Sequence, residues 1–496
     1  MQPTDRWSFT WQSKRRDTPM LASLLLLLAA ALLAGLFFFA SQGNPLSLGP
    51  LLIFAAWRFL PLLGEKADQH IFIGFTILCF AIDDITQNPW GRELEPLTKQ
   101  LGILLFQSFG ITGIEAFAIF FSLWLLLTRS KAQMILWLHQ GLFRILGVGL
   151  AIFLASTVAG LYGIATGGDP VVHFIQTRFL HAFPLWTFIG FVLLRDIAFV
   201  KRLIFWITLL VGLKSLQGIF MYLLHRDVFS QAEYLVDHYY SLFAVIAMIA
   251  MVRYAVHNPN PASIVVNGLG FLILFTTYIL NDRRTSYVGV GLAAIMVPVL
   301  LPLAWLKRHA LKILGLIAFG LFYVAATWNL PAPIGFVGAL VQSFGQEAGS
   351  EGPSYRDLEN ANLFNAVVDQ PLTGLGYGKE FAEVFKMPDI SYVYARYRMI
   401  PHNLFLASWA YGGPLTVGAL SLVFATMIWL SGRLMRESRD PTLFFIGLLS
   451  LFYFMQYFSF VFGDLGLQIN RNQMLAGILM GGCYRLLQEY GFDKGA

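Results

Sequence analysis

The sequence predicts an all-α polytopic membrane protein, on three observations. Hydrophobic residues make up 57% of the 496-residue chain and charged residues only 12%, about half the charged share of a soluble globular domain. Apolar stretches of about 20 residues, long enough to cross a bilayer as helices, recur along the chain. Helices satisfy their own backbone hydrogen bonds in lipid, and the sequence lacks the short alternating strands of a membrane barrel, so a helical bundle follows.

The apolar stretches predict about 12–14 transmembrane helices, the lower number applying if two short stretches, 47–63 and 182–195, are re-entrant. In chain order the expected spans cover residues 19–40, 47–63, 70–86, 105–128, 136–162, 182–195, 202–224, 240–256, 262–281, 285–306, 311–329, 403–430, 441–461 and 467–487. We find no internal repeat and therefore expect one integral membrane domain over residues 1–496. The two cysteines, Cys79 and Cys483, fall within apolar runs, which argues against a disulfide framework or a zinc site.

The basic residues predict how the chain is oriented. Cytoplasmic loops carry an excess of Lys and Arg, and a basic cluster precedes the first span, so with an even number of spans both termini are expected in the cytoplasm. The clusters on this side are Lys14, Arg15 and Arg16; Arg129 and Lys131; Arg195, Lys201 and Arg202; Lys307, Arg308 and Lys312; and Arg433, Arg436 and Arg439. In a bacterial inner membrane the other side is the periplasm. Because the basic residues are scattered over short loops, the net charge of +6 does not indicate nucleic-acid binding.

One loop on the predicted periplasmic side is much longer than the others. It covers residues 330–401, and loops of this length are usually functional. Its segment 356–368, "RDLENANLFNAVV", has helical periodicity, because the 3–4 residue spacing of a helix is followed by Leu358, Ala361, Asn362, Asn365 and Ala366. The following "GLGYGKE" fits neither the phosphate-binding loop nor the dinucleotide fingerprint and is expected to be a turn. We therefore expect a periplasmic cap that carries short helices.

Cations recur on the predicted periplasmic side, where membrane-protein statistics disfavour them. They are Arg178, Arg226, Arg283, Arg284, Arg356 and Arg471. The guanidinium fork matches phosphate and carboxylate geometry, so several of these arginines converging on one cavity would suit a polyanion such as a diphosphate. The alternative for each arginine taken singly is that it extends to the lipid headgroups.

Two ionisable residues lie inside predicted spans. Lys214 interrupts the apolar run "LLVGLKSLQGIF", and Glu115 interrupts "GITGIEAFAIF". An ionisable residue at membrane depth is a functional hypothesis by default. The alternative is that each side chain reaches an interface or pairs with a neighbouring helix.

His402 is the best candidate for a catalytic residue. It follows Pro401 and precedes a long apolar run, so we expect it in the first turn of a helix. The positive field of a helix N-terminus and the nearby Arg396 and Arg398 favour a neutral ring, and a neutral imidazole can accept a proton from an attacking hydroxyl. The alternative is a histidine that only caps or anchors the helix.

Four segments resemble motifs of the O-antigen ligase and O-antigen polymerase superfamily, and their order along the chain also agrees with it. "PHNLFLASWAYGGPLTVG" resembles its His-Asn motif with His402 and Asn403, and "NDRRTSYVG" resembles its Ser-Arg-Gly motif, with Arg284 as the arginine and Arg283 in place of the serine. "YRDLENANLFNAVVDQPLTGLGYGKEF" resembles the segment in which an arginine, here Arg356, precedes a helix and a glycine turn. "HRDVF" is a looser match that would contribute Arg226. The resemblance covers residues 220–430; the first 200 residues match in hydropathy alone.

The resemblance implies a membrane glycosyltransferase of bacterial surface polysaccharide and lipopolysaccharide biosynthesis. Such enzymes take a glycan from undecaprenyl diphosphate at the periplasmic face and pass it to lipid A–core or to a lipid-linked glycan, without a metal or cofactor. It implies His402 as the base, with Arg284 and Arg226 first, and then Arg283 and Arg356, on the diphosphate. Lys214, Arg178 and Asn403 are secondary candidates. A single displacement would invert the anomeric centre.

Three other functions stay open from the sequence. A flippase for lipid-linked oligosaccharides could also bind diphosphate with arginines, but it would be expected to show repeated halves and polar residues through the membrane centre. A ligase that attaches glycans to protein would share the same motifs. A membrane scaffold without catalytic activity would leave the arginines unexplained.

Overall fold

A computed structural model of the protein describes residues 66–81, 112–224, 236, 239–281, 283–330, 338, 354–389, 391, 397–437, 440–463 and 470–490. The expected spans at 19–40 and 47–63 lie outside these residues. By its internal contacts the chain divides into two units, Met1–His70 and Ile71–Ala496. Of the first unit only residues 66–70 are described, and they begin helix α3 (Ala67–Ala81). All that follows concerns the second unit.

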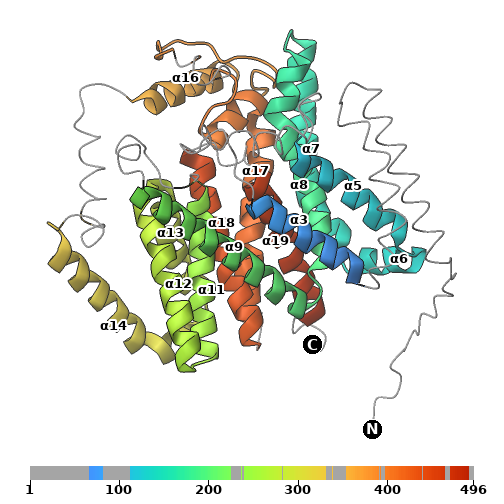
Figure 1. Ribbon diagram of the computed structural model, residues 1–496. Helices are drawn as coiled ribbons and strands as arrows, with labels where there is room; N and C mark the ends of the chain where they lie inside the picture. The colour runs from blue at the N-terminus through green and yellow to red at the C-terminus, as the bar shows by residue number, and fades with distance from the viewer. Residues whose placement is uncertain are drawn as a thin grey trace. The chain divides into compact units, whose positions relative to one another are not determined.

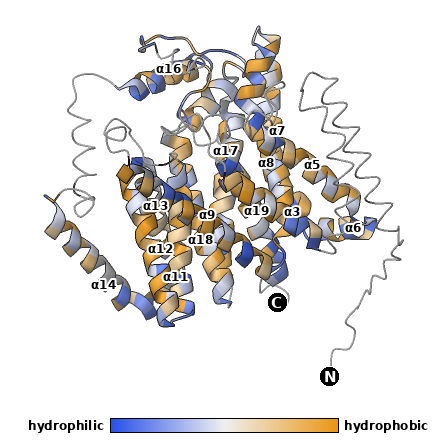
Figure 2. Ribbon diagram, viewed as in Figure 1, coloured by the Kyte–Doolittle hydropathy of each residue, from blue (hydrophilic) through white to orange (hydrophobic). Residues whose placement is uncertain are grey.

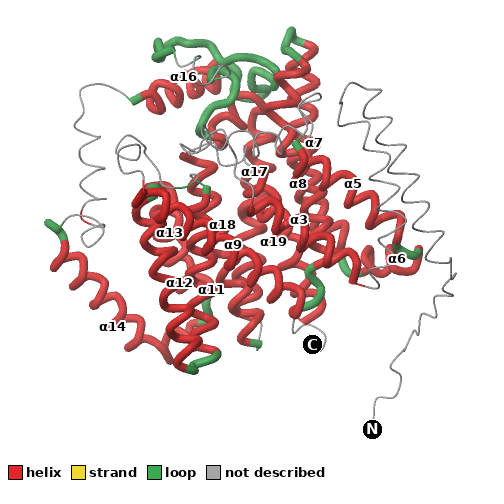
Figure 3. Tube along the Cα trace, viewed as in Figure 1, coloured by secondary structure: helices red, strands yellow, loops and turns green. Residues whose placement is uncertain are grey.

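The described part of the second unit is helical and contains no strand, as the all-α prediction requires (Figures 1 and 3). After α3, the helices are α5 (Gly113–Thr128), α6 (Lys131–His139), α7 (Leu142–Ala165), α8 (Pro170–Leu193), α9 (Ile197–Leu224), α11 (Tyr240–His257), α12 (Pro261–Leu280), α13 (Arg284–Leu300), α14 (Leu303–Thr327), α16 (Tyr355–Asp369), α17 (Leu404–Glu437), α18 (Pro441–Gly463) and α19 (Asn470–Tyr490).

Several of these helices can cross a membrane. In the described part of the chain, six are long and apolar enough to do so: α7, α9, α11, α12, α17 and α18. The α5–α6 pair, bent by 110°, adds a seventh if it is one span. Figure 2 shows apolar residues along these helices and hydrophilic residues mostly towards their ends. The protein is therefore a multi-pass membrane protein.

Helix α8 corrects one predicted span. The sequence predicts a short stretch at 182–195, whereas α8 begins at Pro170 and has 24 residues, about 36 Å of helix. Asp169 caps its N-terminus by accepting from the backbone N–H of Val171 at 2.7 Å, and proline suits the first helical position. Polar residues in the first turns of α8, among them Gln176, hid this part of the helix from a hydropathy reading.

Close backbone packing holds the bundle together. Helix α8 packs extensively along α19, and a Cβ on Gly477 would approach the Cβ of Trp186 and the backbone N of Thr187 at 2.6 and 3.2 Å. Helix α13 packs against α18 in the same way through Gly289. Small residues at such crossings let helix backbones approach closely, which favours association in lipid.

The cap consists of α16 and the turn after it, at one end of the bundle (Figure 1). The turn glycines Gly374, Gly376 and Gly378 have φ values of 65°, 85° and 99°, in the left-handed region that favours glycine. Two backbone N–H groups of the turn donate to carbonyls of α17, and that of Gly378 donates to the Gln176 side chain of α8 at 2.6 Å. The turn prediction for "GLGYGKE" is confirmed, and its role is to tie the cap to α17 and α8.

Candidate functional site

A cavity of about 970 Å³ lies where α16 meets the ends of three long helices. The start of α13, the start of α17 and the end of α18 form its other walls. It is lined by Arg283, Arg284, Thr285, Val288, Leu292, Ser354, Tyr355, Arg356, Glu359, Asn360, His402, Asn403, Phe458, Ser459, Phe462 and Gly463.

The cavity brings together five residues that the sequence singled out. Arg283 and Arg284 come from the start of α13, Arg356 comes from α16, and His402 and Asn403 come from the start of α17. Three guanidinium groups and one imidazole therefore line a single space, although they come from three separate segments of the chain. Arginine side chains are well suited to binding the oxygens of a phosphate or diphosphate.

Another wall of the same cavity is apolar. Val288 and Leu292 continue along α13 from the arginines, and Phe458 and Phe462 face them from α18. Val288 is 44% exposed and Phe462 is 55% exposed, which is more than a closed core would allow. The cavity is thus amphipathic, and an amphipathic ligand with an anionic head and a hydrocarbon tail fits this division.

The first turn of α13, which carries Arg284, is anchored to α18. The hydroxyl of Ser286 donates to Oε1 of Gln456 at 2.7 Å, and the hydroxyl of Ser459 donates to the carbonyl of Thr285 at 2.7 Å. Ser286 and Gln456 are fully buried. Hydrogen bonds of this kind hold a helix in register where the surroundings are apolar, so the backbone beneath Arg284 is held in place.

His402 contacts a buried carboxylate. Its backbone N–H donates to Oε2 of Glu359 at 2.9 Å, and its ring Nδ1 lies 3.1 and 3.2 Å from the two carboxylate oxygens. Glu359 is only 1% exposed. The ring of Tyr355 meets the imidazole edge-on, with 5.9 Å between the ring centroids. The position of His402 is therefore set on two sides by residues of α16.

The expectation that His402 lies in the first turn of a helix is wrong by two residues. Helix α17 begins at Leu404, and Asn403 is its cap, because Oδ1 of Asn403 accepts from the backbone N–H of Leu406 at 3.1 Å. Asparagine is among the best capping residues because its short amide reaches the unsatisfied N–H groups of the first turn. With the cap supplied by Asn403, the imidazole of His402 is directed to Glu359 instead.

Tyr355 is not a base at neutral pH. Burial, and next the carboxylate of Glu359, raise the pKa of the Tyr355 hydroxyl well above its ordinary value. Desolvation and a neighbouring negative charge both disfavour the phenolate. The hydroxyl therefore stays protonated, and His402 is the better proton acceptor of this pair.

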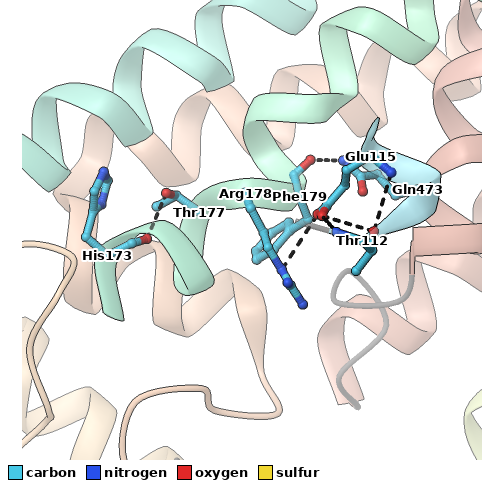
Figure 4. A network of polar contacts seen from close by, with 7 residues as sticks. All are labelled: Thr112, Glu115, His173, Thr177, Arg178, Phe179 and Gln473. Carbon is cyan, nitrogen blue, oxygen red and sulfur yellow. Dashed lines mark hydrogen bonds and ion pairs between the residues drawn. The ribbon is translucent and has the colours of Figure 1, made fainter. Parts of the chain in front are cut away.

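Arg178 does not line the cavity. It belongs to α8, and its Nε lies 3.6 Å from Oε1 of Glu115 on α5. Figure 4 shows Arg178 directed at Glu115, which also accepts from the backbone N–H of Thr112 at 2.8 Å, while Gln473 of α19 donates to the carbonyl of Phe179. Glu115 is 4% exposed, so this cation offsets the charge of a buried carboxylate. The alternative reading of Glu115, pairing with a neighbouring helix, is the one observed.

Of the other predicted cations, those that the structure describes do not line the cavity. Lys214 is half-buried within α9 and is not part of the cavity lining. Arg226 and Arg396 lie outside the described residues. Arg398 pairs with Glu383 at 3.2 Å and does not line the cavity. Arg471, at the start of α19, is buried and also absent from the lining.

Glu359 is the site residue that sequence reasoning missed. The helical spacing noted in segment 356–368 passes through Leu358 and does not include Glu359. The buried residues of α16 are Glu359, Asn362, Leu363, Ala366 and Val367. A hydropathy pattern predicts that an acidic side chain is exposed, so it could not indicate a buried glutamate. The available signal was its spacing, because residues three apart share a helix face and Glu359 follows Arg356 by three positions.

The described residues contain no group of three or more His, Cys, Asp or Glu side chains arranged to hold a metal ion. A scan against models of known protein families finds no match, and a search of curated proteins also finds none. The resemblance to the O-antigen ligase and polymerase superfamily therefore rests on the motif residues themselves.

Proposed function

We propose that the protein is a membrane glycosyltransferase that moves a glycan from a polyprenyl diphosphate to an acceptor hydroxyl in the cavity next to α16. The observation that carries this proposal is the convergence of Arg283, Arg284, Arg356 and His402 on one amphipathic space. In the superfamily that the motifs resemble, the lipid is undecaprenyl diphosphate. The acceptor there is lipid A–core or another lipid-linked glycan.

The two parts of the donor would contact the two kinds of cavity wall. The diphosphate carries the negative charge and suits the guanidinium groups of Arg283 and Arg284, while the isoprenoid chain suits the apolar side chains of Val288 and Phe462. The cations matter most as the glycosidic bond breaks, because negative charge then grows on the departing phosphate oxygen. Arg356 adds a third positive charge from the α16 wall.

His402 is the general base of this proposal. Its Nε2 accepts the proton of the acceptor hydroxyl while that oxygen attacks the anomeric carbon. The bond from the anomeric carbon to the diphosphate oxygen breaks, and its electron pair leaves with the polyprenyl diphosphate. A single displacement of this kind inverts the anomeric centre, and the imidazolium then returns its proton to water. A positioned base typically contributes about 10²–10⁴-fold to the rate.

The proposed orientation has this cavity in the periplasm and both termini in the cytoplasm, in a bacterial inner membrane. Support comes from the opposite ends of the helices, where basic residues gather: Arg195 lies in the connection between α8 and α9, and Arg202 lies near the start of α9. Cytoplasmic loops are enriched in such residues. The test replaces Asp369, which is exposed at the end of α16, with a single cysteine. This cysteine is then labelled with an impermeant maleimide in spheroplasts.

The central experiment is transfer by the purified protein in nanodiscs, with a synthetic polyprenyl-diphosphate glycan and the product identified by mass spectrometry. His402→Ala is expected to abolish transfer without changing membrane insertion, and Arg398→Ala, a nearby arginine outside the cavity, is expected to transfer normally. Full transfer by His402→Ala would end the general-base assignment. Donor binding without transfer to any lipid, glycan or protein acceptor would favour the flippase instead, and transfer to protein alone would identify a protein O-glycan ligase.

A further inference from the structure

We infer that Glu359 is a positioning residue that holds the imidazole of His402 in the tautomer with its proton on Nδ1. This inference rests on the proposed function, since it gives Glu359 a role only through the base. It assigns to α16 a second contribution to the site besides Arg356. The residue acts through His402 and is not itself placed on a reacting atom.

The contact pattern requires donors on His402. An ionised carboxylate can only accept hydrogen bonds, and Glu359 lies within hydrogen-bond distance of both the backbone N–H and the ring Nδ1 of the same histidine. Nδ1 must therefore carry a proton to bond with it. In the neutral ring the other nitrogen, Nε2, is then the acceptor, which is the state that a general base needs.

The two contacts also restrict how the ring can move. One fixes the backbone of His402 and the other fixes the ring on the same carboxylate, so neither rotation of the side chain nor movement of the residue as a whole keeps both bonds. Because Glu359 is 1% exposed, few water molecules can compete for its oxygens. Preorganisation of this kind lowers the barrier because the base needs no reorientation during the reaction.

A purely structural role for Glu359 is the competing explanation, because the same contacts attach α16 to the start of α17. The chain offers a matched control for attachment. Asn362, one turn further along α16, bonds the backbone of Phe385 through both its amide nitrogen and its amide oxygen, at 2.8 and 2.7 Å, and does not touch His402. Asp369, on the exposed end of the same helix, is a control for loss of one negative charge.

The first test is spectroscopic and needs no enzymatic activity. The chain has nine histidines, so the ¹⁵N signals of His402 in labelled protein are identified by their loss in His402→Asn. We expect a protonated Nδ1 and an unprotonated Nε2 in the wild-type protein, and a mixture of tautomers in Glu359→Ala. Asn362→Ala should leave the His402 signals unchanged. An Nε2–H tautomer in the wild-type protein, or signals unaffected by Glu359→Ala, would overturn the inference.

The second test is kinetic. Glu359→Ala and Glu359→Gln are expected to lower kcat by about 10²-fold or more, within the range for general-base catalysis, with the donor KM changed less than about threefold. Combining Glu359→Ala with His402→Ala should add nothing to the loss from His402→Ala alone. Asn362→Ala and Asp369→Asn should keep near wild-type kcat. If the double variant instead loses kcat by the product of the two single losses, Glu359 has a role independent of His402 and the proposal is refuted.

The two tests separate this inference from the proposed function. If His402→Ala transfers normally, the glycosyltransferase mechanism fails whatever the tautomer. If transfer depends on His402 but neither its tautomer nor kcat responds to Glu359→Ala, the mechanism stands and the positioning role fails. Glu359→Gln keeps the volume of the side chain but replaces one of the two acceptor oxygens with a donor NH2 group, so it disturbs the contacts with His402 and serves where Glu359→Ala does not fold.

Discussion

Replacing Gly289 by alanine should disable the site from a position that does not line the cavity. Gly289 lies on α13, about one turn beyond Arg284, at the crossing with α18. An added Cβ would sit 3.0 Å from the backbone N of Gln456 and 2.9 Å from its Cγ, and closer still to its Cα. Because carbon atoms in contact are normally about 3.5–4.0 Å apart, α13 and α18 would have to separate by roughly 1 Å.

That separation would cost both stability and catalytic rate. Overpacking a tight interface typically destabilises a protein by about 1–3 kcal/mol. The same shift also stretches the 2.7 Å bond from Ser286 to Gln456 and moves Arg284 relative to His402. A displacement of about 1 Å in a catalytic arrangement can lower the rate by about 10²-fold, so transfer should suffer more than folding does.

The control is Gly291→Ala on the same helix, where an added Cβ meets no atom within 4 Å. Both variants are purified in nanodiscs, and thermal unfolding and glycan transfer are measured side by side. We expect Gly289→Ala to lose transfer and some thermal stability and Gly291→Ala to match the wild-type protein. Wild-type transfer by Gly289→Ala, or equal damage by Gly291→Ala, would refute the argument that the α13–α18 crossing positions Arg284.

Three further predictions concern single side chains. Arg284→Ala should lower kcat at least about 10²-fold and Arg284→Lys should recover only part of it, because a point charge lacks the planar fork; equal activity of both variants in the transfer assay would contradict this. Arg178→Ala should destabilise the fold by about 1–3 kcal/mol, because it leaves the negative charge of the buried Glu115 without a compensating cation. Adding Glu115→Gln should restore part of the thermal stability without changing kcat. The pKa of Tyr355 is raised in the folded protein, so the stability that its protonated hydroxyl contributes is present below its unfolded pKa of about 10 and is lost as the pH rises further. Tyr355→Phe should therefore unfold less readily than the wild-type protein at alkaline pH when unfolding is followed by circular dichroism. An unchanged alkaline midpoint of unfolding would contradict this prediction.

The sequence by itself determined the fold class and most of the helices. The spans predicted at 240–256, 262–281 and 441–461 match α11, α12 and α18 to within two residues, because long apolar runs bounded by polar residues leave few alternatives in lipid. The turn at Gly374–Gly378 was equally readable, since glycines clustered after a helix favour left-handed backbone. Where apolar character was interrupted by polar residues, as at the start of α8, the helix boundary was misjudged.

The sequence also supplied most of the candidate site, as separate residues. His402, Arg283 and Arg284 stood out as polar groups at the ends of apolar runs, and Arg356 stood out as a cation in the long loop. Only the tertiary structure decided that these four line one cavity while Arg178 lies elsewhere, paired with Glu115. Hydropathy and spacing report the environment of a residue within its own segment. Convergence depends on the crossing of α13, α16, α17 and α18, which is set by side-chain packing between segments far apart in the chain. The same physics hid Glu359, because burial of a carboxylate is favourable only where a partner such as His402 meets it.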